Sequence, residues 1–190
     1  WMAEPDYDVD FGTGKDEWYW ENRKEAFLEN LLKREGKDKW VKDAGGFTRF
    51  GISARAHGKE NVIWDIDKEK AKEIYRSEYM KKGENLFGRT HEAIKFMDME
   101  VNMGYKSDTK KAVQKALNSL LPEDKQIPVD GNFGNVTKNA IKIVQQSNSS
   151  QKIVDALSKY QLEYYASLPD YKTLEKGRKY RASYNPIKED

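Results

Sequence analysis

An apolar helical stripe that ends at a single carboxylate most constrains the fold of this 190-residue chain. The stripe consists of Phe27, Leu28, Leu31 and Leu32. Its spacing predicts a helix over about residues 22–34, with Glu35 on the buried face. A carboxyl group in apolar surroundings resists ionisation, so its pKa is expected to rise. A carboxylic acid that stays protonated near neutral pH can donate a proton to a leaving glycosidic oxygen.

A glycine-rich stretch follows the stripe, over residues 43–53. Three glycines there permit tight turns close to a ligand: Gly45, Gly46 and Gly51. Alternate positions have strand-like character: Thr48, Phe50 and Ile52. The predicted order is therefore a helix, Glu35 and one short β-hairpin. A hairpin opposite a helix end forms a cleft, and Asp43 and Thr48 are predicted to face Glu35 across it. The alternative for Glu35 is a solvated residue or part of a helix cap.

Composition excludes several classes of function. The chain has 34 basic and 32 acidic residues, a net charge of +2, so a broad nucleic-acid interface is not expected. It has no cysteine, which excludes disulfides, thiolate metal sites and a cysteine nucleophile. With only two histidines, a histidine-based metal site is not expected either, and the proposed chemistry needs no metal or cofactor. No apolar run approaches the roughly 20 residues of a membrane span, and no signal peptide is visible.

Hydrophobic periodicity and capping residues predict the remaining elements. Asp67 is a suitable N-cap for a helix over residues 68–81, and residues 82–90 are predicted to form a loop. Asp108 is predicted to cap another helix. The other predicted helices span residues 91–103, 135–146 and 150–168. Residues 1–20 are predicted to be irregular, with Trp18, Tyr19 and Trp20 packed back on the body.

Five ordered motifs resemble those of glycoside hydrolase family 108, a family of lysozyme-like N-acetylmuramidases. The first is Glu35-Gly36 with Asp43-Ala44-Gly45-Gly46 and Thr48-Arg49-Phe50-Gly51-Ile52-Ser53. The second is Glu69-Lys70-Ala71-Lys72-Glu73-Ile74-Tyr75 with Tyr79. The third is Phe96-Met97-Asp98 with Val101-Asn102-Met103-Gly104. The last two are Val113-Gln114-Lys115-Ala116-Leu117 and Val129-Asp130-Gly131-Asn132-Phe133-Gly134. Some members of this family are labelled secretion activators.

The resemblance implies a mainly α, lysozyme-like helical fold with one short β-hairpin. Together with the irregular N-terminal residues, it predicts an organisation in three parts. Residues 1–20 form the irregular arm, residues 21–106 the lysozyme-like catalytic part, and residues 107–190 a helical part that resembles a peptidoglycan-binding module and packs with the rest as one body. The expected partner is the glycan strand of peptidoglycan, with no nucleic acid, no membrane insertion and a monomeric protein. The expected place of action is the bacterial cell wall, in the periplasm or outside the cell.

The expected reaction is hydrolysis of the β-1,4 bond between N-acetylmuramic acid and N-acetylglucosamine. Glu35 is the predicted general acid, and either Asp43 or Thr48 holds the attacking water or steadies positive charge on the sugar ring. The predicted substrate-binding residues are Gly46, Phe50, Tyr79, Asp98 and Asn102.

Several alternatives remain open on the sequence alone. Asp98 and Asn102 share a helix face, so they either contact sugar or form a buried polar pair that positions the turn at Gly104. Residues 130–134 form either a recognition loop or a structural turn before a helix. Because Lys37 and Asp38 replace the family's residues after the glutamate, the protein could be a non-catalytic cell-wall-binding or secretion accessory protein. A lytic transglycosylase, which also needs a single glutamate, is the third possibility.

Overall fold

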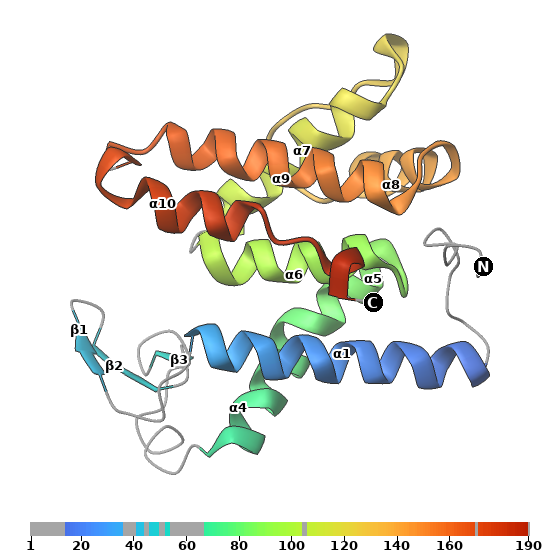
Figure 1. Cartoon of the computed structure of the whole chain (residues 1–190). Helices are drawn as coiled ribbons and strands as arrows, with labels where there is room; N and C mark the ends of the chain where they lie inside the picture. The colour runs from blue at the N-terminus through green and yellow to red at the C-terminus, as the bar shows by residue number, and fades with distance from the viewer. Residues whose placement is uncertain are drawn as a thin grey trace. The chain divides into compact units, whose positions relative to one another are not determined.

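The computed structural model describes residues 14–35, 41–43, 46–49, 52–53, 67–103, 106–169 and 171–189. The chain is mainly α-helical, as the sequence predicts (Figure 1). The described residues form two compact units, one that ends at Lys81 and one that begins at Lys82. Among these residues, no helix combines the length and the apolar character that crossing a membrane requires.

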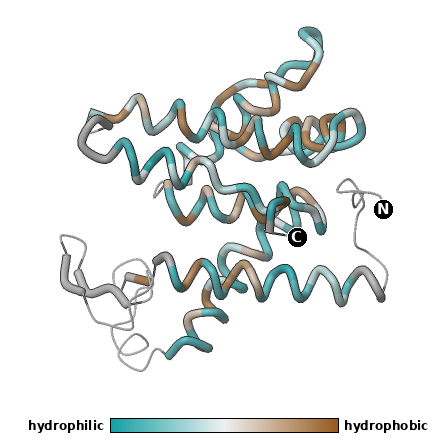
Figure 2. Tube along the Cα trace, viewed as in Figure 1, coloured by the Kyte–Doolittle hydropathy of each residue, from teal (hydrophilic) through white to brown (hydrophobic). Residues whose placement is uncertain are grey.

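The first unit begins with helix α1, which spans Gly14–Glu35. Residues 14–20 are therefore helical, and the prediction that they are irregular is wrong. The reason is that the buried stripe starts at Trp20, one heptad before Phe27, and Trp20 is only 1% exposed. Trp18 is 72% exposed, so the prediction that it packs back on the body is wrong. Figure 2 shows the apolar positions of α1 recurring between hydrophilic ones.

Three short strands follow α1 in the stretch where the sequence predicts one hairpin. They are β1 (Val41–Asp43), β2 (Gly46–Arg49) and β3 (Ile52–Ser53), and they form an antiparallel sheet in the order β1-β2-β3. Ile52 is fully buried.

Helix α4 spans Lys68–Tyr75, and Asp67 caps it as predicted, because its carboxylate accepts the Lys70 N–H at 2.8 Å. The π-helical turn η1 (Arg76–Met80) follows directly.

The second unit contains a helix that the sequence analysis missed. Residues 82–87, which were predicted to belong to a loop over residues 82–90, are helical and form most of α5 (Lys81–Phe87). A β-carbon at Gly83 would lie 2.9 Å from the Ala93 carbonyl and from Met97 Cγ, so this glycine permits close packing of two helices. Gly88, with φ of +72°, is the residue that ends the helix. Gly83 thus allows two helices to pack closely, whereas Gly88 ends a helix, and the sequence alone does not distinguish these roles.

The remaining helices are α6 (His91–Met103), α7 (Lys106–Leu120), α8 (Asn135–Ser147), α9 (Ser150–Ala166) and α10 (Tyr171–Ala182). Short 3₁₀ turns cover Glu123–Lys125 and Pro186–Glu189. Helix α9 packs against α6, α7 and α10. Asp108 lies inside the first turn of α7 instead of capping it, and its carboxylate accepts the Tyr164 hydroxyl at 3.3 Å.

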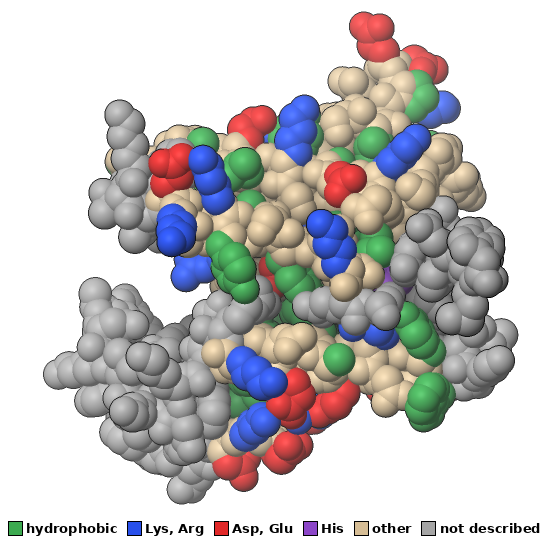
Figure 3. All heavy atoms as spheres, viewed as in Figure 1, with side chains coloured by type: hydrophobic (Ala, Val, Ile, Leu, Met, Phe, Trp, Pro, Cys, Tyr) green, Lys and Arg blue, Asp and Glu red, His purple; other side chains and the backbone are tan. Residues whose placement is uncertain are grey.

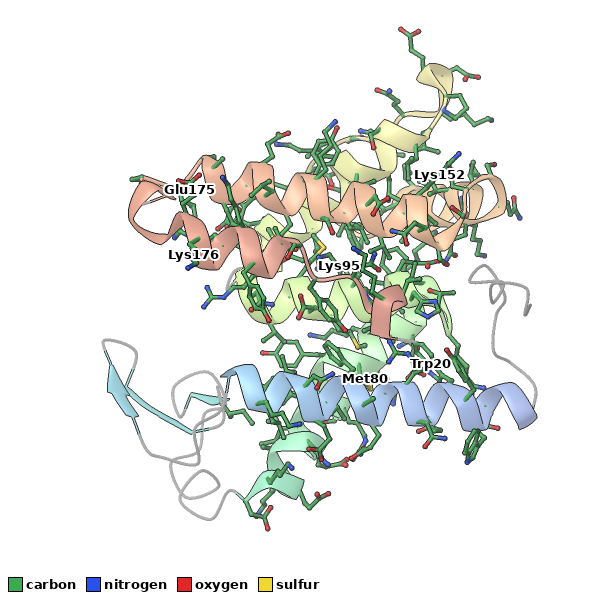
Figure 4. The ribbon with its side chains drawn as sticks, viewed as in Figure 1. Trp20, Met80, Lys95, Lys152, Glu175 and Lys176 are labelled. Atoms are coloured by element: carbon green, nitrogen blue, oxygen red, sulfur yellow. The ribbon has the colours of Figure 1, made fainter. Side chains whose placement is uncertain are left out.

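A buried lysine fastens the end of the chain to α6. Lys95 is completely buried, and its ammonium donates to the carbonyls of Ala182 (3.1 Å) and Tyr184 (2.8 Å). Figure 4 labels Lys95 between α6 and the segment that follows α10. Because carbonyls at a helix C-terminus carry partial negative charge, a cation there is well placed.

Candidate functional site

Helix α1 carries Glu35, the predicted general acid, as its last residue. The stripe that precedes it is buried as predicted, since its four residues are at most 3% exposed: Phe27, Leu28, Leu31 and Leu32. The side chain of Glu35 lies outside the described residues. The backbone therefore puts Glu35 at the end of a helix whose apolar face is packed.

The register of the sheet relates Asp43 to Thr48. Asp43 pairs with Gly46, and Thr48 pairs with Val41 on one side and Ser53 on the other. Paired positions of an antiparallel sheet share a face, as do positions two apart on one strand. The positions of Asp43 and Thr48 therefore belong to the same face. Their side chains, and Phe50 as a whole, lie outside the described residues.

A cluster of ion pairs holds α4 against α1 within the first unit. The Lys72 side chain is 4% exposed, and its ammonium contacts the carboxylates of Glu25 (2.5 Å) and Glu29. Arg76 contacts the second oxygen of Glu25 at 2.5 Å, and Lys68 contacts Glu29 at 2.6 Å. We name these five residues the α1–α4 ion cluster; Figure 3 shows acidic and basic side chains gathered on this unit. The helix that carries Glu35 is thus fixed partly by charge.

These contacts shift the pKa values of the cluster. The hydrogen bond from Lys72 lowers the pKa of Glu25, with a smaller contribution from Arg76. Hydrogen bonds from Lys68 and Lys72 lower the pKa of Glu29 to about 2. The same bonds to Glu25 and Glu29 raise the pKa of Lys72 above its usual range. All three groups are therefore charged across the neutral range.

Tyr79, a predicted substrate-binding residue, lies in the π-helical turn η1. It is half-buried, and its ring lies 5.6 Å from that of Tyr75 at a tilt of 40°. Single π-helical turns within helices occur often at functional sites. The sequence pattern of this segment gave no sign of the π turn, because the spacing of its apolar residues is that of an ordinary helix.

Asp98 and Asn102 lie on α6, in the second compact unit. Asp98 is completely buried, and the Asn102 amide donates to the Asp98 backbone carbonyl at 2.8 Å. Asp98 also lies close enough to Tyr165 to contribute to a raised pKa of that phenol, which burial causes first. Full burial of Asp98 fits the alternative of a buried polar group better than direct sugar contact.

The chain matches two protein-family models. Residues 28–104 match the family model of glycosyl hydrolase 108, and residues 109–182 match that of the predicted peptidoglycan domain. Residues 28–104 belong to the glycosyl hydrolase 108 family. This glycosyl hydrolase 108 segment contains all eight predicted site residues. At family level the two matches together identify a glycoside hydrolase that acts on peptidoglycan.

A solved structure shares the fold. The chain is 23% identical to the one described as "Structure of Brucella abortus SagA", with a TM-score of 0.63, and the match covers 86% of this chain and 91% of that one. No curated protein matches the sequence.

The boundary between the two family matches, at residues 104–109, differs from the boundary between the compact units, at Lys81 and Lys82. Residues 82–103, which form α6 and all of α5 but its first residue, thus belong to the glycosyl hydrolase 108 segment and to the same compact unit as the peptidoglycan domain.

The turn at residues 130–134, in the peptidoglycan domain, is organised by one buried amide. Gln114 accepts the N–H groups of Asp130 (3.0 Å) and Gly131 (2.8 Å) and donates to the Asp130 carboxylate and the Asn132 carbonyl, both at 3.0 Å. Gly131 has φ of +76°, and a β-carbon there would lie 2.9 Å from the Ser107 hydroxyl. These contacts give the turn a structural role, which was one of the two alternatives from the sequence.

Sequence reasoning missed Glu92, a buried carboxyl group of the glycosyl hydrolase 108 segment. Glu92 is 2% exposed, and it accepts the Gln145 amide at 3.0 Å and the Ser150 hydroxyl at 2.7 Å. Burial raises its pKa, against the opposing effect of these hydrogen bonds. No local signal could have identified it, because both partners lie more than 50 residues away in the chain.

Proposed function

We propose that this chain is an N-acetylmuramidase that hydrolyses the β-1,4 bond between N-acetylmuramic acid and N-acetylglucosamine in peptidoglycan. In this proposal the Glu35 carboxylic acid gives its proton to the glycosidic oxygen as the bond to the muramic acid carbon breaks. A water molecule then attacks that carbon and loses a proton, which leaves a reducing muramic end. The observation that carries the proposal is the position of Glu35, at the end of a packed apolar stripe and within the glycosyl hydrolase 108 match.

The second group of the reaction is Asp43 or Thr48. The shared face of their sheet positions supports a role for both near one point. If the Asp43 carboxylate activates the water, the two carboxyl groups are expected to lie roughly 6.5–9.5 Å apart and the anomeric configuration inverts. If Thr48 positions the water, Asp43 has a minor role. We further propose that the N-acetyl sugars contact Gly46, Phe50, Tyr79 and Asn102. Because Asp98 is completely buried, we propose that it stabilises helix α6 and does not contact the sugar.

Replacement of the proposed acid tests the function. Glu35→Gln should lower the rate of peptidoglycan cleavage by roughly 10²–10⁴, as expected for one general acid. Glu21→Gln is the matched control, since it makes the same change at a 57% exposed side chain of the same helix. Mass spectrometry of the digest separates the functional classes. Reducing muramic ends support the muramidase, anhydro-muramoyl ends identify a lytic transglycosylase, and no cleavage identifies an accessory protein.

The choice between Asp43 and Thr48 needs two further variants. Asp43→Asn should cost far more activity than Thr48→Ala if the carboxylate activates water, and the first product should then be the α-anomer. The reverse order of severity assigns the water to Thr48, which is the role we favour. NMR of the first-formed anomer provides the second measurement. Wild-type rates for both variants would remove the sheet from the mechanism.

A further inference from the structure

A cavity of about 410 Å³ opens in the second unit, between the C-terminal ends of α5 and α8. Its walls come from both family matches: Glu84, Gly88 and Glu92 from the glycosyl hydrolase 108 segment, and Lys142 and Gln145 from the peptidoglycan domain. None of these residues belongs to the site proposed for hydrolysis. The cavity is large enough for several residues of a peptide or one sugar with its substituents.

The wall of this cavity is held in place before any ligand arrives. Gln145 donates to the Phe87 carbonyl at 2.8 Å and to Glu92 at 3.0 Å, so it joins the end of α8 to the ends of α5 and α6. Thr90 caps the start of α6, since its hydroxyl accepts the Ala93 N–H and donates to the same Phe87 carbonyl. A preformed wall lowers the entropic cost of binding.

The chemistry of the lining favours a peptide over a sugar ring. Lys142 is exposed and forms no ion pair within the described part of the chain, so its ammonium can meet a carboxylate. Glu84 supplies a carboxylate for an amine, and Asn85 and Gln145 supply side-chain amides. Sugar rings usually stack on exposed aromatic faces, whereas the aromatic residue of this lining, Phe87, is 2% exposed.

We propose that this cavity, which we name the α5–α8 pocket, binds the stem peptide of peptidoglycan. The stem peptide carries backbone amides, free carboxylates and, in uncrosslinked strands, a free side-chain amine. Lys142 would receive a carboxylate and Glu84 the amine. The inference rests on the proposed function in that it takes peptidoglycan as the substrate, and it adds that the enzyme reads the peptide as well as the glycan. The pocket therefore selects strands whose peptides are uncrosslinked.

Peptide binding can be measured apart from catalysis, because a free peptide has no glycosidic bond. We would titrate the ¹⁵N-labelled full chain with a synthetic stem pentapeptide and, separately, with a peptide-free N-acetylglucosamine oligomer. The peptide should shift the amide signals of Gly88 and Gln145, and the oligomer should not. Lys142→Glu should weaken peptide binding by roughly tenfold, or about 1.4 kcal/mol, since an attraction to the peptide carboxylate becomes a repulsion. Lys138→Glu, an exposed lysine of α8 outside the pocket, should change the affinity by less than about twofold.

A second comparison identifies the amine contact. Acetylation of the peptide amine should weaken binding to the wild type by roughly threefold to fivefold, and should have no further effect on Glu84→Gln. The proposal is overturned if the peptide causes no shift at the pocket, if the oligomer shifts the same signals, or if Lys138→Glu weakens binding as much as Lys142→Glu. If the wild-type chain does not cleave peptidoglycan, the proposed function is overturned, but these binding results are not affected.

Discussion

The two compact units are stabilised by different interactions. In the unit that ends at Lys81, partly exposed ion pairs join the long helix α1 to α4: the Lys72 ammonium is buried, while its partners Glu25 and Glu29 have side chains that are 42% and 33% exposed. In the unit that begins at Lys82, a buried amide (Gln114) and a buried hydroxyl (Ser150, with Glu92) make long-range hydrogen bonds, beside the buried Lys95 ammonium that holds the end of the chain. Charge pairs respond to pH and salt, whereas neutral hydrogen bonds respond mainly to the loss of a partner.

This difference bears on function because α1 carries the proposed acid. The position of Glu35 depends on a helix that the α1–α4 ion cluster fixes, so acid and salt are expected to loosen the proposed catalytic part first. In the turn of the peptidoglycan domain Gln114 does not titrate, and the group that responds to acid is Asp130, whose pKa is lowered by hydrogen bonds from the Asn132 N–H and the Gln114 amide.

Loss of the Gln114 amide should be the most damaging change to stability. Gln114→Leu keeps the approximate size of a completely buried side chain but leaves the N–H groups of Asp130 and Gly131 without their acceptor. We expect the free energy of unfolding to fall by about 2–3 kcal/mol, as for a buried group that loses its partners. Urea titration followed by far-UV circular dichroism measures it, and 1 M NaCl should not change the difference. Gln146→Leu, at an exposed position, should cost less than about 0.5 kcal/mol.

Removal of the central cation of the α1–α4 ion cluster should have the next largest effect. Lys72→Met keeps the apolar stem and leaves Glu25 and Glu29 without the buried ammonium. Because both partners are partly solvated, we expect a loss of about 1–2 kcal/mol rather than the larger cost of a fully buried pair. All five tryptophans precede residue 65, so tryptophan fluorescence during urea titration reports on this part of the chain. In 1 M NaCl the difference from wild type should shrink; a salt-independent loss would contradict the comparison.

Acid should also weaken the cluster, by an amount that partial exposure keeps small. The pKa of Glu29 falls from 4.5 to about 2 on folding, and that of Glu25 falls as well. A lowered carboxyl pKa stabilises the folded state above pH 4.5, and this contribution is lost as the pH falls toward 2. In the second unit the signs oppose each other: the raised pKa of Glu92 favours folding in acid, and the lowered pKa of Asp130 disfavours it.

The measurement for this prediction is stability against pH, between pH 6 and 2.5. The free energy of unfolding, measured by tryptophan fluorescence during urea titration, should fall over this range in the wild type. It should fall less in Lys72→Met, which has already lost the main contact of Glu25. An acid response of equal size in the two proteins would show that other carboxylates are responsible. The proposed acid is not part of the readout, because stability rather than activity is measured.

The sequence predicted the elements whose signals are local. Helix α6 spans the predicted residues 91–103, and α8 and α9 differ from prediction by one and two residues at their C-terminal ends. Helix α10 was missed because its described inward residues include Arg178 and Ala182, which do not form an apolar stripe. Helix α5 was missed because Gly83 was interpreted as a loop residue rather than as a point of close helix packing.

The same rule holds for the candidate site: features set within one helix could be predicted, and contacts between distant residues could not. The place of Glu35 at the end of a buried stripe follows from spacing within one helix, so the sequence could predict it. The contacts of Lys72 with Glu25 and of Gln145 with Glu92 join residues 47 and 53 positions apart. Charge patterns within a single helix carry no information on such partners, and lysines and glutamates are common throughout this chain. Neither the α1–α4 ion cluster nor the α5–α8 pocket could therefore be predicted.

The smallest expected effect comes from an ion pair of the second unit. Lys115 contacts Glu163 at 3.5 Å, and the two side chains are 49% and 54% exposed. Lys115→Ala should change the free energy of unfolding by less than about 0.5 kcal/mol, because water and salt screen an exposed pair. Lys72→Met and Lys115→Ala thus remove the same kind of contact at 4% and 49% exposure of the lysine. If urea titration gave equal losses for the two, burial of the ammonium would not explain the strength of the α1–α4 ion cluster, and its geometry, with two carboxylates around one cation, would be the remaining cause.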